Sequence, residues 1–535
     1  MRIRPLHFPR LAAFFFTAVV GAAIAAPSGS TSAPATSRAV VGFESNSKLA
    51  LALKRFPGAR IIRRLPHVKT VEVELPGRAE DLHGLPGIDY AHRPRLRTIK
   101  AEPALTAVFR PGLPYEWQYV ATRVNEVPED VLRAASAIKI AVVDTGLDVT
   151  HPDIAAKNPE TWDIVHRRPS VADRDGHGTF VSALAAGSVT NGDGIAGFGG
   201  DAQLLTIKAV GAGDSFSDVD EAAAIVYAVD HGAKVINLSI GGEGSSPLET
   251  RAIEYAATRN VLLVAAAGNE YEDGNPVEYP AAALQPVGSK GQGGFGLAVA
   301  ATTMAGRRAS FSNTGTQISL AAPGENVFGA IAAGSSREWW PRYPLPGSTE
   351  GLYGWSSGTS FATPEVAGAA ALVWAANPAL TAQQVAGILK ATASGRGRWN
   401  PQLGYGVMDV AAAVASARGQ SVKPRVKAGS WLSVRRVADR TSFGTHARAK
   451  NRIRRVSLAV YLRSSMPTVT PDYRMVTLQV RRGGSWHRLA RRTTRLGGGI
   501  RWTVGLKPGR YVLRAVYRGR WDLSSAIRLK PVYVR

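Results

Sequence analysis

The sequence predicts an α/β fold, a mostly parallel sheet with crossover helices, preceded by a small α+β unit and followed by an antiparallel β-sandwich. Between residues 138 and 417, strand-like apolar runs alternate with helix-like runs, as in sheets covered on both faces. Residues 37–105 carry a short strand–helix pattern, and residues 428–535 alternate apolar and polar residues with period two. The 535 residues suffice for about three domains.

The amino terminus has the parts of a secretory signal peptide. Three arginines within the first ten residues precede an apolar run, residues 11–26, that contains Ala23-Ile24-Ala25 near its end. This run of sixteen residues is shorter than the ~20 that a spanning helix needs. We therefore predict a signal peptide over residues 1–25 and a mature protein that is secreted or held in the periplasm or cell envelope.

Residues 37–105 predict a small βαββαβ unit. Five of its segments can be located: a strand at 39–43, a helix at 47–56, a strand at 67–75, a weaker helix at 80–85 and a strand at 88–99. About 70 residues make an independent but marginal subdomain.

Residues 112–418 predict the central α/β unit. Its strand-like runs are 138–146, 202–210, 233–242, 260–269 and 296–303, and its helix-like runs are 178–188, 219–232, 247–260, 361–377 and 381–393. Polar residues follow several of these strands. In parallel sheets, functional groups gather at the carboxyl ends of the strands, so we look for the chemistry there.

Residues 428–535 predict the β-sandwich. Val456, Leu458, Val460 and Leu462 share one strand face, opposite Ser457, Tyr461 and Arg463. Turn sequences at Gly483-Gly484 and Pro508-Gly509 separate such segments, as in antiparallel sandwiches of about 100 residues.

Four residues form a candidate catalytic set. Asp144 ends a strand, His177 opens a helix, Ser360 begins another helix, and Asn269 ends a strand. A serine hydroxyl needs a base to take its proton, and a buried carboxylate orients the histidine that acts as that base. A helix amino terminus and a side-chain amide can stabilise an oxyanion.

The segments around these residues, DTG at 144, HGT at 177 and GTSFATPEVAG at 358, together with AAAGN, resemble the subtilisin-like serine peptidases. The resemblance covers residues 114–417. It implies that Asp144 orients the histidine, His177 is the general base and then general acid, Ser360 is the nucleophile and Asn269 stabilises the oxyanion. Taken singly, each residue could equally be a turn former, a satisfied polar group or a helix cap.

The same resemblance implies further contacts. Ser239, Ile240 and Gly241 match an edge that pairs with an extended substrate backbone, and Ala267 and Gly268 match the wall of the first specificity pocket. Glu270 either faces that pocket and favours Lys or Arg, or is a solvated loop carboxylate. Phe180 and Glu365 stand where better-known members often have histidine.

The chemistry requires no cofactor, and a structural calcium is the metal that the resemblance implies. Asp153 and Asn191 match two family calcium ligands and carry the oxygen donors that Ca²⁺ prefers. They could instead be residues that cap loops. The absence of cysteine excludes disulfides, thiol nucleophiles and cysteine metal clusters.

The charge is unevenly placed and suggests separate partners. Residues 1–110 carry a net +10, residues 111–420 a net −10, and residues 421–535 a net +25 with 23 arginines. Residues 39–99 resemble the family's inhibitory pro-domain, so this unit would plug the cleft of the central unit until cut between about residues 100 and 114. The basic module binds an anionic cell-envelope surface, solubilises the chain, or docks on the acidic central unit. Export and the lack of a signature motif disfavour nucleic acid.

The sequence therefore predicts a secreted endopeptidase, made as an autoprocessed zymogen, that acts on polypeptides. Two alternatives stay open: a catalytically silent scaffold that displays the basic module, and a hydrolase that uses the same residues on esters or other amides. The intact set of four residues argues against the first alternative. The expected substrate edge at residues 239–241 favours peptides over the second.

Overall fold

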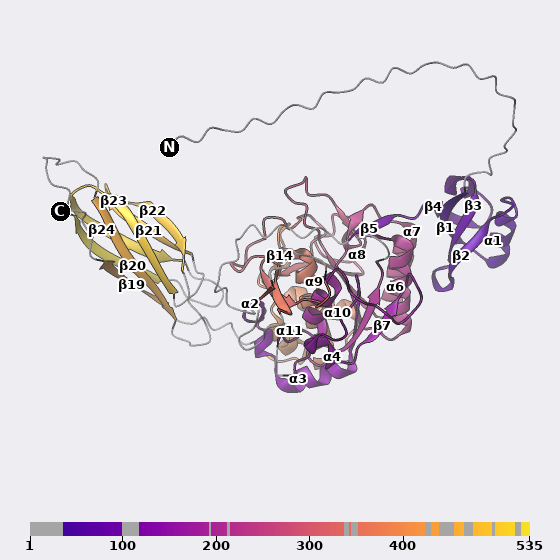
Figure 1. The fold of residues 1–535 in the computed structure, drawn as a ribbon, viewed down its shortest axis with the longest axis horizontal. Coiled ribbons are helices and arrows are strands. Elements are labelled where there is room, and N and C mark those ends of the chain that lie inside the picture. The colour runs from indigo at the N-terminus through magenta and orange to yellow at the C-terminus, as the bar shows by residue number, and fades with distance from the viewer. Residues whose placement is uncertain are drawn as a thin grey trace, which may run out of the picture.

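The three predicted units are all present in the computed structural model (Figure 1). It describes residues 36–98, 117–191, 194–210, 215–335, 342–343, 351–422, 430–437, 454–464, 475–494, 498–518 and 526–534. The predicted signal peptide, residues 1–25, and the predicted processing segment, residues 100–114, lie outside these residues. In the described part of the chain, no helix has both the length and the apolar character needed to cross a membrane.

The first unit is a four-stranded antiparallel sheet with the order β2-β3-β1-β4. Its elements are β1 (Thr36–Phe43), α1 (Asn46–Leu53), β2 (Arg60–Leu65), β3 (Thr70–Pro76) and β4 (Ile88–His92), with 3₁₀ turns at Pro66–Val68 and Ala79–Leu82. Leu49 of α1 packs with Val41 and Val73 of the sheet, and all three are buried.

The strand predicted over residues 88–99 is two strands in the structure. β4 ends at His92, and β5 (Leu96–Thr98) leaves the first sheet to pair with β9 (Ser215–Ser217) of the central unit. Pro94 lies between them, and proline has no N–H to continue a ladder. The first unit is therefore joined to the central unit by a strand.

The central unit is built on a seven-stranded sheet in which every neighbouring pair is parallel, in the order β15-β14-β12-β10-β6-β8-β7. The strands are β6 (Lys139–Asp144), β7 (Glu160–Asp163), β8 (Gln203–Lys208), β10 (Val235–Leu238), β12 (Leu262–Ala266), β14 (Gly296–Thr302) and β15 (Leu320–Pro323). Shorter strands are β11 (Gly242–Glu243), β13 (Glu278–Tyr279), β16 (Val327–Ala330), β17 (Arg342–Tyr343) and β18 (Tyr353–Ser356).

Helices cover both faces of this sheet, as the apolar runs predict. They are α2 (Trp117–Thr122), α3 (Glu129–Ala134), α4 (Pro152–Ala155), α5 (His177–Ala186), α6 (Asp218–Asp230), α7 (Pro247–Thr258), α8 (Ala281–Leu284), α9 (Thr359–Ala376), α10 (Ala382–Thr392) and α11 (Val410–Ala417). Ile140 and Val142 of β6 pack with α5 and α9, whereas Ala141 and Val143 pack with α6 and α7. Successive side chains of a strand point to opposite faces, so one strand serves two cores.

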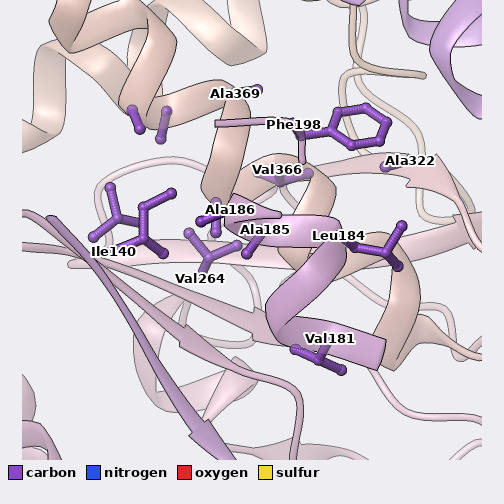
Figure 2. Close-up of a cluster of buried hydrophobic side chains, with 14 of the residues drawn as sticks. Ile140, Val181, Leu184, Ala185, Ala186, Phe198, Val264, Ala322, Val366 and Ala369 are labelled. Carbon is purple, nitrogen blue, oxygen red and sulfur yellow. The ribbon is translucent and has the colours of Figure 1, made fainter. Parts of the chain in front are cut away.

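The α5–α9 face holds the helices that begin with the candidate histidine and serine. Figure 2 shows Val181 and Leu184 of α5 and Val366 and Ala369 of α9 in one cluster with Ile140 of β6, and all of them are fully buried. α9 contains small residues along its length, which lets it pass close beneath the sheet. This packing fixes where the amino termini of α5 and α9 lie.

The third unit is a sandwich of two antiparallel sheets with the orders β19-β20-β23 and β22-β21-β24-β25. The strands are β19 (Ser430–Val437), β20 (Arg454–Ser464), β21 (Met475–Arg482), β22 (Ser485–Thr493), β23 (Gly499–Leu506), β24 (Gly509–Tyr517) and β25 (Ala526–Val534). The predicted apolar face of residues 456–462 is buried in its core. Gly483 and Gly484, both at positive φ, join β21 to β22 as tight hairpins require.

Candidate active site

Asp144 and His177 meet at the carboxyl end of β6. Asp144 is the last residue of β6, and His177 is the first residue of α5. The Nδ1 atom of His177 lies 2.8 Å from Oδ1 of Asp144, and both side chains are fully buried. Because a carboxylate only accepts hydrogen bonds, Nδ1 carries the proton and Nε2 carries the lone pair of the neutral ring.

A second acidic residue, Asp173, supports this pair. The carboxylate of Asp173 accepts hydrogen bonds from the hydroxyls of Thr145 and Thr179, at 2.9 and 2.6 Å, and from the N–H of Gly176 at 2.9 Å. It therefore ties the loop after β6 to the start of α5. Asp173 was not predicted as a functional residue, and the signal that could have indicated it is its position four residues before His177.

Ser360 lies in the first turn of α9, next to the histidine helix. The ring of Phe361 lies 5.6 Å from the ring of His177 and 4.6 Å from that of Phe180, so the start of α9 packs directly on the start of α5. The Oγ of Ser360 donates a weak hydrogen bond, 3.5 Å long, to the carbonyl of Ser239. The hydroxyl of Ser239 donates in turn to the carbonyl of Ser360 at 2.7 Å.

Asn269 is fixed with its amide nitrogen uncommitted. Its Oδ1 accepts hydrogen bonds from the backbone N–H and the hydroxyl of Thr359, at 2.8 and 2.9 Å. Its Nδ2 is buried and has no hydrogen-bond partner among the described residues. A buried donor without a partner costs free energy, and a donor beside a helix amino terminus is suited to receive a developing negative charge.

The expected substrate edge follows β10, beside Ser360. Ser239, Ile240 and Gly241 are buried or nearly so, and Gly241 exchanges two backbone hydrogen bonds with Thr98 of β5, at 3.1 and 3.3 Å. An extended segment of the chain thus already pairs with this edge.

The expected pocket wall follows β12. Ala267 is buried, and its N–H donates to the carbonyl of Val299 at 3.0 Å. Gly268 has φ of +102°, and a Cβ there would lie 2.4 Å from the amide of Asn313. Glu270 is half-buried, and its Oε2 accepts the N–H of Asn269 at 2.7 Å. A role of Glu270 in substrate preference stays a prediction.

Glu365 is enclosed in α9, one turn beyond Ser360. Its side chain is fully buried, and neither carboxylate oxygen has a hydrogen-bond partner among the described residues. Burial raises the pKa of this carboxyl well above its usual range, because a charge is costly in an apolar interior. Glu365 is therefore protonated more readily than an exposed glutamate would be.

Asp153 and Asn191 adjoin each other, as the calcium expectation requires. The amide nitrogen of Asn191 donates to Oδ1 of Asp153 at 2.7 Å, and the N–H of Ile195 donates to Oδ2 at 3.1 Å. Burial raises the pKa of Asp153, and these hydrogen bonds oppose the effect. Both oxygens thus accept N–H donors, and the described residues hold no group of three His, Asp or Glu side chains placed to bind a metal ion. Ca²⁺ takes six to eight oxygen ligands, so calcium binding stays a prediction.

Comparison with known proteins identifies the family. Residues 135–406 match the subtilase family of peptidases, family S8, and this region contains all four candidate residues. The chain belongs to the subtilase family. It is a serine protease of this family, a hydrolase that acts on polypeptides.

Several curated relatives and solved structures agree with this assignment. The chain is 30% identical to an alkaline protease of Alkalihalobacillus alcalophilus over 407 residues, 74% of this chain and 96% of that protein. It is 36% identical to subtilisin Savinase of Lederbergia lenta, over 52% of this chain and 91% of that protein. With a thermophilic serine proteinase of Bacillus sp. (strain AK1) it shares 36% identity over 46% of this chain and 54% of that protein.

Fervidolysin of Fervidobacterium pennivorans has the same fold. This keratinolytic enzyme related to subtilisin matches with a TM-score of 0.60 at 22% identity, over 94% of this chain and 76% of that chain. At this identity the match supports the fold alone. The predicted subtilisin-like architecture is thus confirmed.

Proposed function

We propose that this subtilase is an exported endopeptidase that cleaves peptide bonds through an acyl-enzyme on Ser360. The observation that carries the proposal is the buried 2.8 Å hydrogen bond from His177 to Asp144, beside the first turn of α9, which contains Ser360. With Nδ1 protonated, Nε2 of His177 is the base that takes the Ser360 proton while Oγ attacks the peptide carbonyl.

The remaining steps follow from the same groups. The tetrahedral oxyanion would accept hydrogen bonds from Nδ2 of Asn269 and from the amino terminus of α9. The protonated His177 then gives its proton to the leaving amine, and the amine departs as the C–N bond breaks. Water repeats the sequence on the acyl-enzyme and releases the carboxylic acid and the free Ser360.

We also propose that the first unit is an inhibitory pro-domain. It packs on α6 and α7 through two ion pairs. Arg63 lies 2.8 Å from Asp220 of α6, and Asp89 lies 2.6 Å from Arg251 of α7. The pairing of β5 with β9 and Gly241 supports an occupied substrate edge. Removal of this strand, by cleavage within residues 100–114, would open the site.

Export and surface attachment complete the proposal. The predicted signal peptide supports secretion or retention in the cell envelope. In the described part of the sandwich, Arg481, Arg482, Arg488 and Arg501 are exposed, as a module that binds anionic polymers or lipids requires. Charge of this kind also serves solubility.

The test compares the wild type with Ser360→Ala. We expect the purified wild type to process itself and hydrolyse casein, and the variant to stay unprocessed and inactive. Hydrolysis of a small ester without any cleavage of peptides or of the precursor would favour the esterase alternative. Equal casein hydrolysis by both proteins would refute the assignment of Ser360.

A further inference from the structure

A single arginine of the pro-domain is fully buried in the central unit. Arg97 lies in β5, and its Nε is 2.8 Å from Oε2 of Glu221 in α6. Its Nη2 is 3.0 Å from Oε2 of Glu249 in α7. All three side chains have no exposed surface. We refer to Glu221 and Glu249 as the glutamate pair.

The glutamate pair belongs to the central unit, whereas the arginine arrives on a different strand. Each glutamate also has one buried oxygen, Oε1, without a hydrogen-bond partner among the described residues. Asp218, the first residue of α6, adds a third negative charge nearby and binds the backbone of Arg95, at 2.8 and 2.9 Å. Buried carboxylates without a cation are strongly unfavourable, so this pocket favours a positively charged side chain.

The pKa values of the glutamate pair and of Arg97 depend on one another. Burial and the charge of Glu249 raise the pKa of Glu221 to about 8, and Arg97 opposes that rise. Burial also raises the pKa of Glu249. For Arg97, burial lowers the pKa of the guanidinium, but the two glutamates outweigh it and raise the pKa overall. Without the guanidinium, the two carboxylates would repel each other, and ionisation of both at once would be disfavoured.

The backbone around Arg97 fixes where this pocket lies relative to Ser360. β5 is antiparallel to β9, with Arg97 opposite Phe216, and Thr98 is opposite Gly241 on the other side. If a bound peptide continues in the register of β5, the residue two positions after the one that corresponds to Thr98 lies opposite Ser239. The carbonyl of Ser239 accepts the hydrogen bond from the Ser360 hydroxyl. The bond after that residue of the peptide would be attacked. The arginine is therefore the fourth residue before the cleaved bond.

We propose that the glutamate pair makes this protease select peptides with arginine at the fourth position before the cleaved bond, and that Arg97 occupies the same pocket in the precursor. The inference rests on the proposed function of Ser360. Arginine should be preferred to lysine, because the two glutamates approach different nitrogens of the planar guanidinium, whereas an ammonium is a single point charge.

The experiment uses the mature enzyme, separated from its pro-domain, and quenched peptides that differ only at the fourth position: arginine, lysine or norleucine. We expect kcat/KM for arginine to exceed that for norleucine by at least about tenfold, the range for hydrogen bonds to charged groups. Glu221→Gln and Glu249→Gln should each lower this ratio about tenfold. Glu254→Gln, at an exposed position of the same helix α7, is the matched control and should keep the ratio.

Each other outcome has a distinct meaning. If the wild type cleaves the arginine and norleucine peptides equally, the glutamate pair only docks the pro-domain and the inference is wrong. If an arginine moved one residue toward the bond gives the same advantage, general attraction between charges explains the preference and the inference is also wrong. If the wild type cleaves no peptide at all, the proposed function itself fails.

Discussion

The uncommitted amide nitrogen of Asn269 leads to a quantitative prediction. Replacing Asn269 by Ala removes the donor Nδ2 and the two hydrogen bonds that Oδ1 accepts from Thr359. Because the donor meets charge only in the transition state, kcat should fall about 10²–10³-fold, or about 2.7–4 kcal/mol, the range measured for an oxyanion donor in subtilisin, a relative of this chain. KM should stay within about threefold.

A control variant tests whether the loss of kcat comes from Nδ2 of Asn269 itself or from the hydrogen bonds that hold its side chain in place. Thr359→Val removes the hydroxyl that binds Oδ1 of Asn269 but leaves Nδ2 in place, so kcat should fall much less. Steady-state kinetics on a chromogenic peptide give kcat and KM, and thermal unfolding of the same samples reports stability. The account of the oxyanion site would be refuted by Asn269→Ala with kcat within about fivefold of the wild type, or by an equal loss of kcat in Thr359→Val.

Three further predictions concern pH, metal and the basic module. The pKa of Glu365 is raised in the folded state, so the stability of the wild type falls as pH rises above the pKa of this group in the unfolded chain. From about pH 5 upward, Glu365→Gln should therefore gain stability relative to the wild type by up to about 1.4 kcal/mol per pH unit. Urea unfolding in a Ser360→Ala background measures the difference, and a difference that does not change with pH would contradict the prediction. If Asp153 and Asn191 bind calcium, Ca²⁺ at a hundredfold excess over Kd should add about 2.7 kcal/mol to the free energy of unfolding and so raise Tm relative to EDTA. Asp153→Asn should abolish the shift, and an unchanged Tm in the wild type counts against the site. A chain ending at Gln420 should keep peptide hydrolysis but lose salt-sensitive binding to phosphatidylglycerol vesicles. If the truncated chain still bound the vesicles, the binding surface would lie outside the basic module.

The fold was predictable because its signals are local. Continuous apolar runs such as residues 261–266 indicate buried parallel strands, and the alternation over residues 456–462 indicates a sandwich strand. The strand at 88–99 was predicted as one although Pro94 lies inside it, and the missing N–H of proline argues for two. Its exact partner, β9, lies more than a hundred residues away in the sequence.

The candidate site was predictable for a related reason. Asp144 and Asn269 follow parallel strands, and such ends meet at one edge of the sheet. The glutamate pair could not be predicted, because Glu221 and Glu249 look like ordinary acidic residues near helix starts. Their proximity to Arg97 depends on the register of a strand from another unit. The enclosure of Glu365 depends likewise on which face of α9 meets the core.

Mapping of a fluorophosphonate adduct tests the central claim most directly. The mature wild type and a His177→Ala variant are treated with the reagent, digested and analysed by mass spectrometry. We predict one adduct on Ser360 in the wild type, with labelling at least about 10³-fold slower in the variant because the base is missing. An adduct on a different residue, or equally fast labelling of both proteins, would contradict the proposed roles of Ser360 and His177.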